Sequence, residues 1–201
     1  MKKVLQISFL LTIFVGCNSS YIHSSTSHYE AINEGDLYFP LKPDSVEGQE
    51  NDKLITFMNK WYSENMVRLK EPVLYKHTGR DFNVFRFTKI GTWGESTSYR
   101  IEKTDSNVSI VKRTKDLPGN LIADEKKLLS KENWSALEAR IQSIAFWHLN
   151  THGERGLDGE EWILEGLDDD KYHFVIRWSP DLHGDKEFVK ACNLFEDLFK
   201  K

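Results

Sequence analysis

Two histidines, His148 and His152, stand four residues apart in the sequence and have a spacing that could serve metal chemistry. On a helix this spacing places both rings on one side, with Glu154 close by. A zinc hydrolase of the HExxH type carries its general-base glutamate directly after the first histidine, and Leu149 stands at that place. The pair supplies two of the four ligands that zinc needs. The alternative is that both rings end a helix, where one of them lies near its negative pole.

A second group that could do chemistry is the stretch "RWSPDLHGD", which places Ser179, Asp181 and His183 close together. Catalytic triads are defined by geometry rather than by closeness in sequence, and the G-x-S-x-G motif of a nucleophile elbow is absent. We therefore expect these residues to form a loop, and we assign no catalytic residue and no cofactor. A hydrolase, metal-assisted through His148 and His152 or serine-based at Ser179, remains the alternative function.

The stretch "GLDGEEWILEGLDDDKYHFVIRWSP" (156–180) predicts two strands joined by a tight turn. With Asp168, Asp169 and Asp170 as a three-residue turn, Trp162 faces Ile176 and an apolar side results. The other side then carries four charged or titratable residues, which are Glu161, Glu165, His173 and Arg177. Glu161 faces Arg177 in this register. The charged side is a candidate binding face, and cross-strand ion pairing is its structural alternative.

The N-terminus has the pattern of a secretory signal. Two lysines follow Met1, and residues 4–15 form an apolar run that is too short to cross about 30 Å of hydrocarbon as a helix. The chain turns abruptly polar after Cys17. Residues 1–16 are therefore expected to be a signal peptide, and residues 17–50 a flexible tether and irregular entry segment.

The residues Phe14-Val15-Gly16-Cys17 resemble a bacterial lipobox. The resemblance implies that the Cys17 thiol receives a diacylglycerol, that the chain is cut before it, and that the new amine is acylated, for instance with palmitate. The protein would then be a membrane-anchored lipoprotein of the cell envelope. Since Asn18 is not the aspartate that retains such proteins at the inner membrane, we expect the outer membrane, with the domain facing the periplasm or the cell surface. Ordinary secretion and an uncleaved anchor helix are the alternatives.

Composition narrows the functions further. The 201 residues are 39% hydrophobic and 12% aromatic, which is typical of a globular chain, and carry a net charge of −4 with no basic stripe. Nucleic acid is therefore not an expected partner. Besides Cys17 the sequence has one cysteine, Cys192, which shares a predicted helix face with Phe188, Phe195 and Phe199 and is expected in the core.

Periodicity predicts an α+β fold for residues 51–201, with a single domain, an antiparallel sheet of about five or six strands, and about three helices packed on it. We predict helices at 52–67, 131–149 and 185–200, and strands at 81–90, 96–104, 107–114, 160–167 and 171–178. Before this domain, residues 37–39 could still pack on it.

The C-terminal half resembles a set of uncharacterised bacterial proteins and lipoproteins with the pattern "FW-x-L … GLDG-x-x-W-x-LE … YH-x-V-x-RWSP". The matching residues are Phe146, Trp147, Leu149, Gly156 to Gly159, Trp162, Leu164, Glu165, Tyr172, His173, Val175 and Arg177 to Pro180. Arg86 in "VFRF" and Arg100 in "SYRIE" also match. The resemblance spans about residues 70–198 and implies no activity, substrate or catalytic residue.

These observations together favour a lipid-anchored envelope protein whose domain binds a protein partner, as an adaptor, inhibitor or immunity-type factor. Trp134, Trp147 and Trp162 fall on predicted core faces. Trp93 and Trp178 fall near strand ends, where an exposed indole would suit contact with a protein or glycan. A shallow surface with exposed aromatics would favour binding, and a deep pocket of titratable groups would favour the hydrolase.

Overall fold

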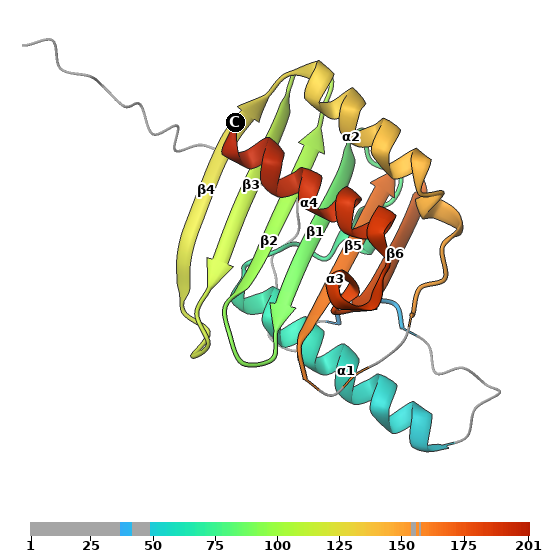
Figure 1. Ribbon diagram of the computed structural model, residues 1–201. Helices are drawn as coiled ribbons and strands as arrows, with labels where there is room; N and C mark the ends of the chain where they lie inside the picture. Colours follow the sequence, from blue (N-terminus) through green and yellow to red (C-terminus); the bar gives the residue numbers. More distant parts are fainter. Residues whose placement is uncertain (1–36, 42–48, 154–155, 157) are drawn as a thin grey trace, which may run out of the picture.

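Six strands form one antiparallel sheet in the order β4-β3-β2-β1-β5-β6 (Figure 1). The structure, a computed structural model, describes residues 37–41, 49–153, 156 and 158–201. The strands are β1 (Asn83–Gly91), β2 (Ser96–Lys103), β3 (Val108–Lys115), β4 (Leu121–Leu129), β5 (Glu160–Asp168) and β6 (Lys171–Trp178). The predicted α+β domain with an antiparallel sheet is confirmed.

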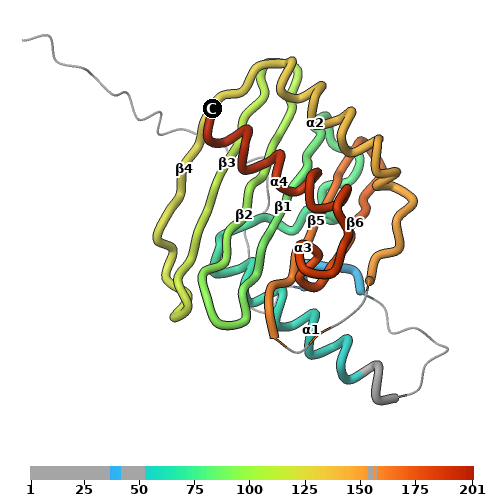
Figure 2. Tube along the Cα trace, in the orientation of Figure 1, coloured from blue at the N-terminus to red at the C-terminus, as the bar shows by residue number. Residues whose placement is uncertain are grey.

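Helices cover both faces of the sheet (Figures 1 and 2). Helices α2 (Lys131–Ser143) and α4 (Lys186–Lys200) lie on one face, and α1 (Gln49–Arg68) lies on the other. Three short elements complete the fold: the 3-10 helices η1 (Leu74–His77) and η2 (Phe146–His148), and helix α3 (Pro180–His183). Because helices cover both faces, many strand residues are buried on both sides.

The larger core lies between the sheet and α2 with α4. Phe87 of β1 and Trp162 of β5 pack with Phe195 of α4. Cys192 is fully buried in the same cluster, which confirms its predicted core position. Burial also raises the pKa of its thiol well above the ordinary value, so the thiol stays protonated and unreactive.

The second core lies between the sheet and α1. Tyr38 and Phe39 are buried there, and the Tyr38 amide donates to Ser63 Oγ of α1 at 3.0 Å. The Phe39 ring contacts Tyr62 edge-on, at a centroid distance of 6.0 Å. The entry segment at 37–41 is therefore part of the folded domain. The predicted packing of residues 37–39 is confirmed for Tyr38 and Phe39, whereas Leu37 is half exposed.

The helix predicted at 131–149 is shorter than expected. It begins at the predicted cap, where Ser130 and Asn133 form a reciprocal capping box. It ends at Ser143, because Ala145 adopts a left-handed conformation with φ of 50° and a 3-10 turn follows. The prediction was wrong beyond Ser143, since the apolar periodicity continues through the turn while the backbone does not.

The predicted three-residue turn between β5 and β6 is also wrong. Asp168 pairs with Lys171, so Asp169 and Asp170 form a two-residue turn, with Asp169 at φ 55°. Trp162 therefore faces Arg177 rather than Ile176. The prediction assumed one apolar and one exposed side, whereas this sheet is covered on both sides and no such sorting is required.

Strand β4 was missed in the sequence because four of its nine residues are charged and most are exposed. It pairs with β3 along its length and is the edge strand of the sheet. Charged side chains on an edge strand discourage pairing with other chains. The other edge, β6, is partly covered by a short parallel bridge between His152 and Ile176.

Gly166 in β5 gives a first prediction. A Cβ at this position would lie 2.7 Å from Phe146 Cε1 and 2.9 Å from Phe85 Cε1. Substituting Gly166→Ala should lower the free energy of unfolding by ~1–3 kcal/mol because the core is overpacked there. Urea unfolding measures this value. The matched control is Gly94→Ala, where nothing lies within 4 Å of the new Cβ; equal effects of the two substitutions would contradict the prediction.

Candidate functional site

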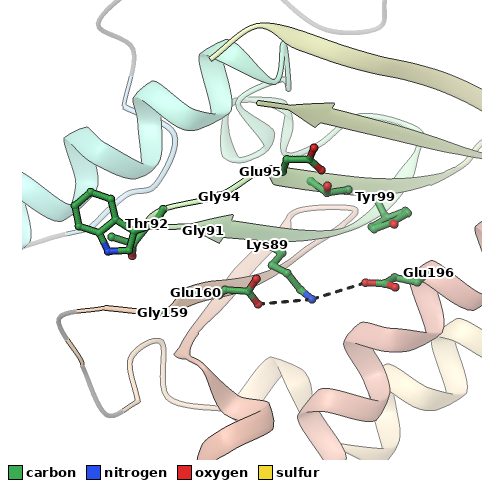
Figure 3. Close-up of a pocket in the computed structure, with 11 residues that line it drawn as sticks. Lys89, Gly91, Thr92, Gly94, Glu95, Tyr99, Gly159, Glu160 and Glu196 are labelled. Carbon is green, nitrogen blue, oxygen red and sulfur yellow. Dashed lines mark ion pairs between the residues drawn. The ribbon is translucent and has the colours of Figure 1, made fainter. Parts of the chain in front are cut away.

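An open groove with a cavity volume of about 590 Å³ lies where the β1–β2 turn, the start of β5 and helix α4 meet (Figure 3). The turn is held to β5 by a hydrogen bond from the Thr92 amide to the Gly159 carbonyl, at 3.0 Å. Gly159 has a φ of +128°, which residues with side chains rarely adopt. Backbone at Thr92 and Gly159 thus forms part of the lining of the groove.

The indole of Trp93 stands at the lip of this groove. It is 77% exposed, although Trp is a residue that folded proteins usually cover. Its Nε1 donates a hydrogen bond to Asp158 Oδ1 at 3.1 Å. The ring is therefore oriented by the protein and yet left open to solvent.

A lysine lies between two carboxylates inside the groove, as Figure 3 shows. Lys89 Nζ is 3.7 Å from Glu160 Oε2 and 4.0 Å from Glu196 Oε1. It also lies over the Trp162 ring, 4.4 Å from the ring centroid. These three contacts fix the cation in place as part of the wall.

Acidic groups outnumber basic ones in the groove, because Glu95, Glu160 and Glu196 line it with Lys89 as the cation. Burial, together with the nearby Glu196 and Glu125 carboxylates, raises the pKa of Tyr99 to about 12. Its hydroxyl therefore stays protonated at neutral pH. An exposed aromatic ring beside carboxylates is suited to a cationic or hydroxyl-rich group.

A second cluster of charged residues lies fully inside the protein, between the sheet and the segment that follows α1. Arg86 of β1 donates from Nε and Nη2 to both oxygens of Glu165 in β5, at 2.6 and 2.7 Å. Its Nη1 donates to the Pro72 carbonyl at 2.7 Å and to Glu71 Oε2 at 3.3 Å. Arg86, Glu71 and Glu165 have no exposed area.

Glu71 joins this network to β2. It accepts hydrogen bonds from Ser98 Oγ at 2.9 Å and from Arg100 Nη1 at 2.5 Å. Burial alone would raise the pKa of Glu71, but the guanidinium groups of Arg100 and Arg86 outweigh burial and lower the pKa. Burial raises the pKa of Glu165 in spite of Arg86. Since the cluster is closed to solvent, its role is to hold the layers together.

The four residues of the predicted binding face do not share a face. Glu161 and Glu165 point to the α1 side, where Glu165 is fully buried. His173 and Arg177 point to the side of α2 and α4. His173 Nε2 lies 3.0 Å from the Leu149 carbonyl, and Arg177 donates to the Asn150 carbonyl at 3.1 Å. The prediction of a shared face was wrong because it assumed the wrong register between β5 and β6.

The structure also separates His148 and His152. His148 ends the 3-10 helix η2, whereas His152 lies in the bridge to β6. Within the described ranges, no group of three or more His, Cys, Asp or Glu side chains could hold a metal ion. The predicted helix that would have aligned the two rings ends before either of them.

Ser179 has a structural role at the end of β6. It is buried, and its Oγ accepts a hydrogen bond from the Glu160 amide at 3.1 Å, which fixes the start of β5. The His183 ring stacks on Trp178, with centroids 4.3 Å apart. The described geometry thus uses the serine hydroxyl for a backbone contact rather than bringing it to the histidine.

Of the predicted site residues, Cys17 lies outside the described residues. Trp93 is exposed as expected, Trp134 and Trp162 are buried, and Trp147 and Trp178 are partly buried. Sequence reasoning missed Lys89, Glu160 and Glu196, because nothing local links them. The available signal was the "GTWGE" turn, which places a large aromatic residue at the tip of a hairpin.

Comparison with known proteins adds no family: no protein-family model matches the chain, and no curated protein matches it. In the part of the chain that the structure describes, no helix has the length and apolar character needed to cross a membrane.

The buried network gives a second prediction. Replacing Arg86→Met leaves the carboxylates of Glu71 and Glu165 buried without their shared cation, and should lower the free energy of unfolding by ~3–5 kcal/mol. Arg140→Met is the control, because Arg140 makes its ion pair with Glu187 at the surface and should change stability little. Urea unfolding compares the two variants, and similar values for both would contradict the structural role of Arg86.

The lowered pKa of Glu71 gives a prediction on pH. Its ionised form contributes stability that is fully present above pH 4.5, its ordinary pKa, and is lost as pH falls through the lowered pKa of the folded protein. Glu165 acts in the opposite sense, so the comparison of wild type with Glu71→Gln isolates Glu71. The difference in free energy of unfolding should be large at pH 7 and shrink below pH 4.5. A difference that is constant with pH would show that folding leaves the pKa of Glu71 unchanged, and a difference that falls as pH rises above 4.5 would show that the pKa is raised instead.

Proposed function

We propose that this protein is a cell-envelope lipoprotein, anchored through lipidated Cys17, whose domain binds a protein partner at the groove beside Trp93. The lipobox-like sequence supports the anchor. The partner would be a component of the cell envelope, and the protein would act on it as an adaptor, an inhibitor or an immunity-type factor. The outer membrane is the proposed location, because Asn18 lacks the retention signal of an inner-membrane lipoprotein.

The observation that carries the binding function is the exposed, oriented indole of Trp93. Tryptophan is enriched among the residues that dominate binding energy at protein interfaces. Since the hydrogen bond to Asp158 already orients the ring, little side-chain freedom is lost when a partner covers it.

The charge of the groove indicates which kind of partner residue would bind in it. Three carboxylates, those of Glu95, Glu160 and Glu196, line the groove, and Lys89 is the one lysine among the described residues that line it. A lysine or arginine side chain of the partner could stack on the indole and reach these carboxylates. We therefore propose a basic segment as the part of the partner that enters the groove.

We propose binding rather than hydrolysis because the residues of the alternative hydrolase site are not arranged for catalysis. The hydroxyl of Ser179 bonds a backbone amide inside the fold. His148 and His152 belong to different elements. The groove, in contrast, combines a concave surface with an exposed aromatic ring, as a binding surface requires.

Site-specific photocrosslinking in cells tests the binding function. A photoreactive amino acid at Glu95, on the rim of the groove, should capture one reproducible protein. The same probe at Gln142, exposed on α2, serves as the control. Adding Trp93→Ala should weaken binding at least ~30-fold, the effect of removing a hot-spot residue, and should therefore reduce the yield of the Glu95 crosslink. Equal capture at both positions, or a crosslink that Trp93→Ala leaves unchanged, would contradict the proposal.

Metabolic labelling tests the anchor separately. Labelled palmitate should enter the wild-type protein and the Cys192→Ala variant but not Cys17→Ala, since lipid attachment needs the Cys17 thiol. Label in none of the three would leave simple secretion. Label that persists in Cys17→Ala would place the lipid elsewhere.

A further inference from the structure

Helix α1 has two apolar lines, and the fold uses one of them. Ile55, Tyr62 and Met66 are buried against the sheet. On the outside, Leu54 is 42% exposed and Phe57 is 63% exposed, and Trp61 is half-buried beside them. Residues 54, 57 and 61 have the i, i+3, i+7 spacing of a continuous line along a helix. We call these three residues the outer stripe.

Basic residues flank the outer stripe. Lys53 and Lys60 are exposed on the same side of α1. Glu64 is the acidic residue on the exposed side within the described residues 53–68, and it lies 3.9 Å from Lys60. Leu, Phe and Trp with lysines beside them are typical of a helix that lies in the interface of a membrane with anionic lipids.

The place where the chain enters the domain relates this surface to the anchor. Tyr38 bonds Ser63 of α1, so the entry segment joins the domain in the α1 layer and not in the layer of α2 and α4. Cys17 precedes Leu37 by about 20 residues, which span at most ~70 Å. The described part of the chain therefore enters the domain in the α1 layer, the layer that also carries the outer stripe.

We infer that the outer stripe of α1 rests on the surface of the membrane that holds the lipid anchor, with Lys53 and Lys60 against anionic headgroups. This inference depends on the anchor in the proposed function. The whole chain carries a charge of −4, so an anionic membrane repels most of the domain and favours approach by its basic, apolar side. Contact there would fix how the tethered domain is oriented.

Spin labelling of the lipidated protein tests the inference. The protein is reconstituted in vesicles of phosphatidylethanolamine and phosphatidylglycerol, with a nitroxide at Phe57→Cys or, as the control, at Gln142→Cys on α2. Cys192 is fully buried and Cys17 carries lipid, so only the new cysteine is labelled. The label at position 57 should lose accessibility to a water-soluble nickel chelate and gain accessibility to oxygen, and the label at 142 should remain accessible to the chelate. Lys53→Glu with Lys60→Glu should restore chelate access at position 57.

Two results would overturn the inference while leaving the anchor intact. The first is protein that floats with the vesicles but shows equal chelate access at positions 57 and 142. The second is spin–spin broadening at position 57, which would show that a second copy covers the outer stripe. Protein that does not float with the vesicles would remove the anchor itself, and the inference with it.

Discussion

The fold depends on one buried guanidinium. Arg86 lies on β1, the strand between β2 and β5, and binds both oxygens of Glu165 on β5. Through Nη1 it also holds Pro72 and Glu71, in the segment that leaves α1. A buried carboxylate is costly without a partner, so α1 can close over this face only if the network is complete. The α1 layer in turn buries Tyr38 and Phe39 and leaves the outer stripe on the surface. The entry segment meets the buried network directly, because the Tyr38 hydroxyl donates to the Glu71 carbonyl at 2.7 Å.

The residues of the "FW-x-L … GLDG-x-x-W-x-LE … YH-x-V-x-RWSP" pattern, with Arg86 and Arg100, have roles in the architecture of the domain. Arg86, Arg100 and Glu165 belong to the buried network, and Tyr172 donates to Glu165 Oε1 at 2.9 Å. The glycines of "GLDG" serve close packing, since a Cβ on Gly156 would lie 1.9 Å from the Trp178 ring and one on Gly159 would lie 2.4 Å from Ser179 Oγ. Phe146 and Trp147 fill the space above Gly166. Thus the pattern describes how the last hairpin is built, and the groove at Trp93 lies mostly outside it.

Local periodicity was enough to predict the class of fold and most elements. The range predicted for β6 was correct, and α4 begins one residue later than predicted. The failures share a physical cause, which is that the deciding partner is distant in sequence. The register of β5 and β6 could not be derived from apolar and polar sorting, because Glu165 is buried by Arg86, 79 residues away. Similarly, β4 is held by its pairing with β3 rather than by an apolar pattern of its own. The groove was beyond prediction because Lys89, Glu160 and Glu196 meet only when β1, β5 and α4 are assembled.

Some exposed apolar side chains indicate surfaces that the packing of the fold does not account for. Single exposed residues such as Leu117, Leu128 and Leu182 are ordinary in folded proteins and need no special cause. Trp93 differs, because a hydrogen bond orients it over a groove. The outer stripe also differs, because its members are aligned along one helix. Burying apolar area is favourable by about 25 cal/mol per Å². The side chains of Trp93, Leu54 and Phe57 are exposed and belong to neither of the two main cores, whereas Trp61 packs partly against the core under α1. A partner at the groove and a membrane at α1 would each bury this exposed apolar area and gain the free energy of its burial. For this reason, the functions are proposed for these two surfaces.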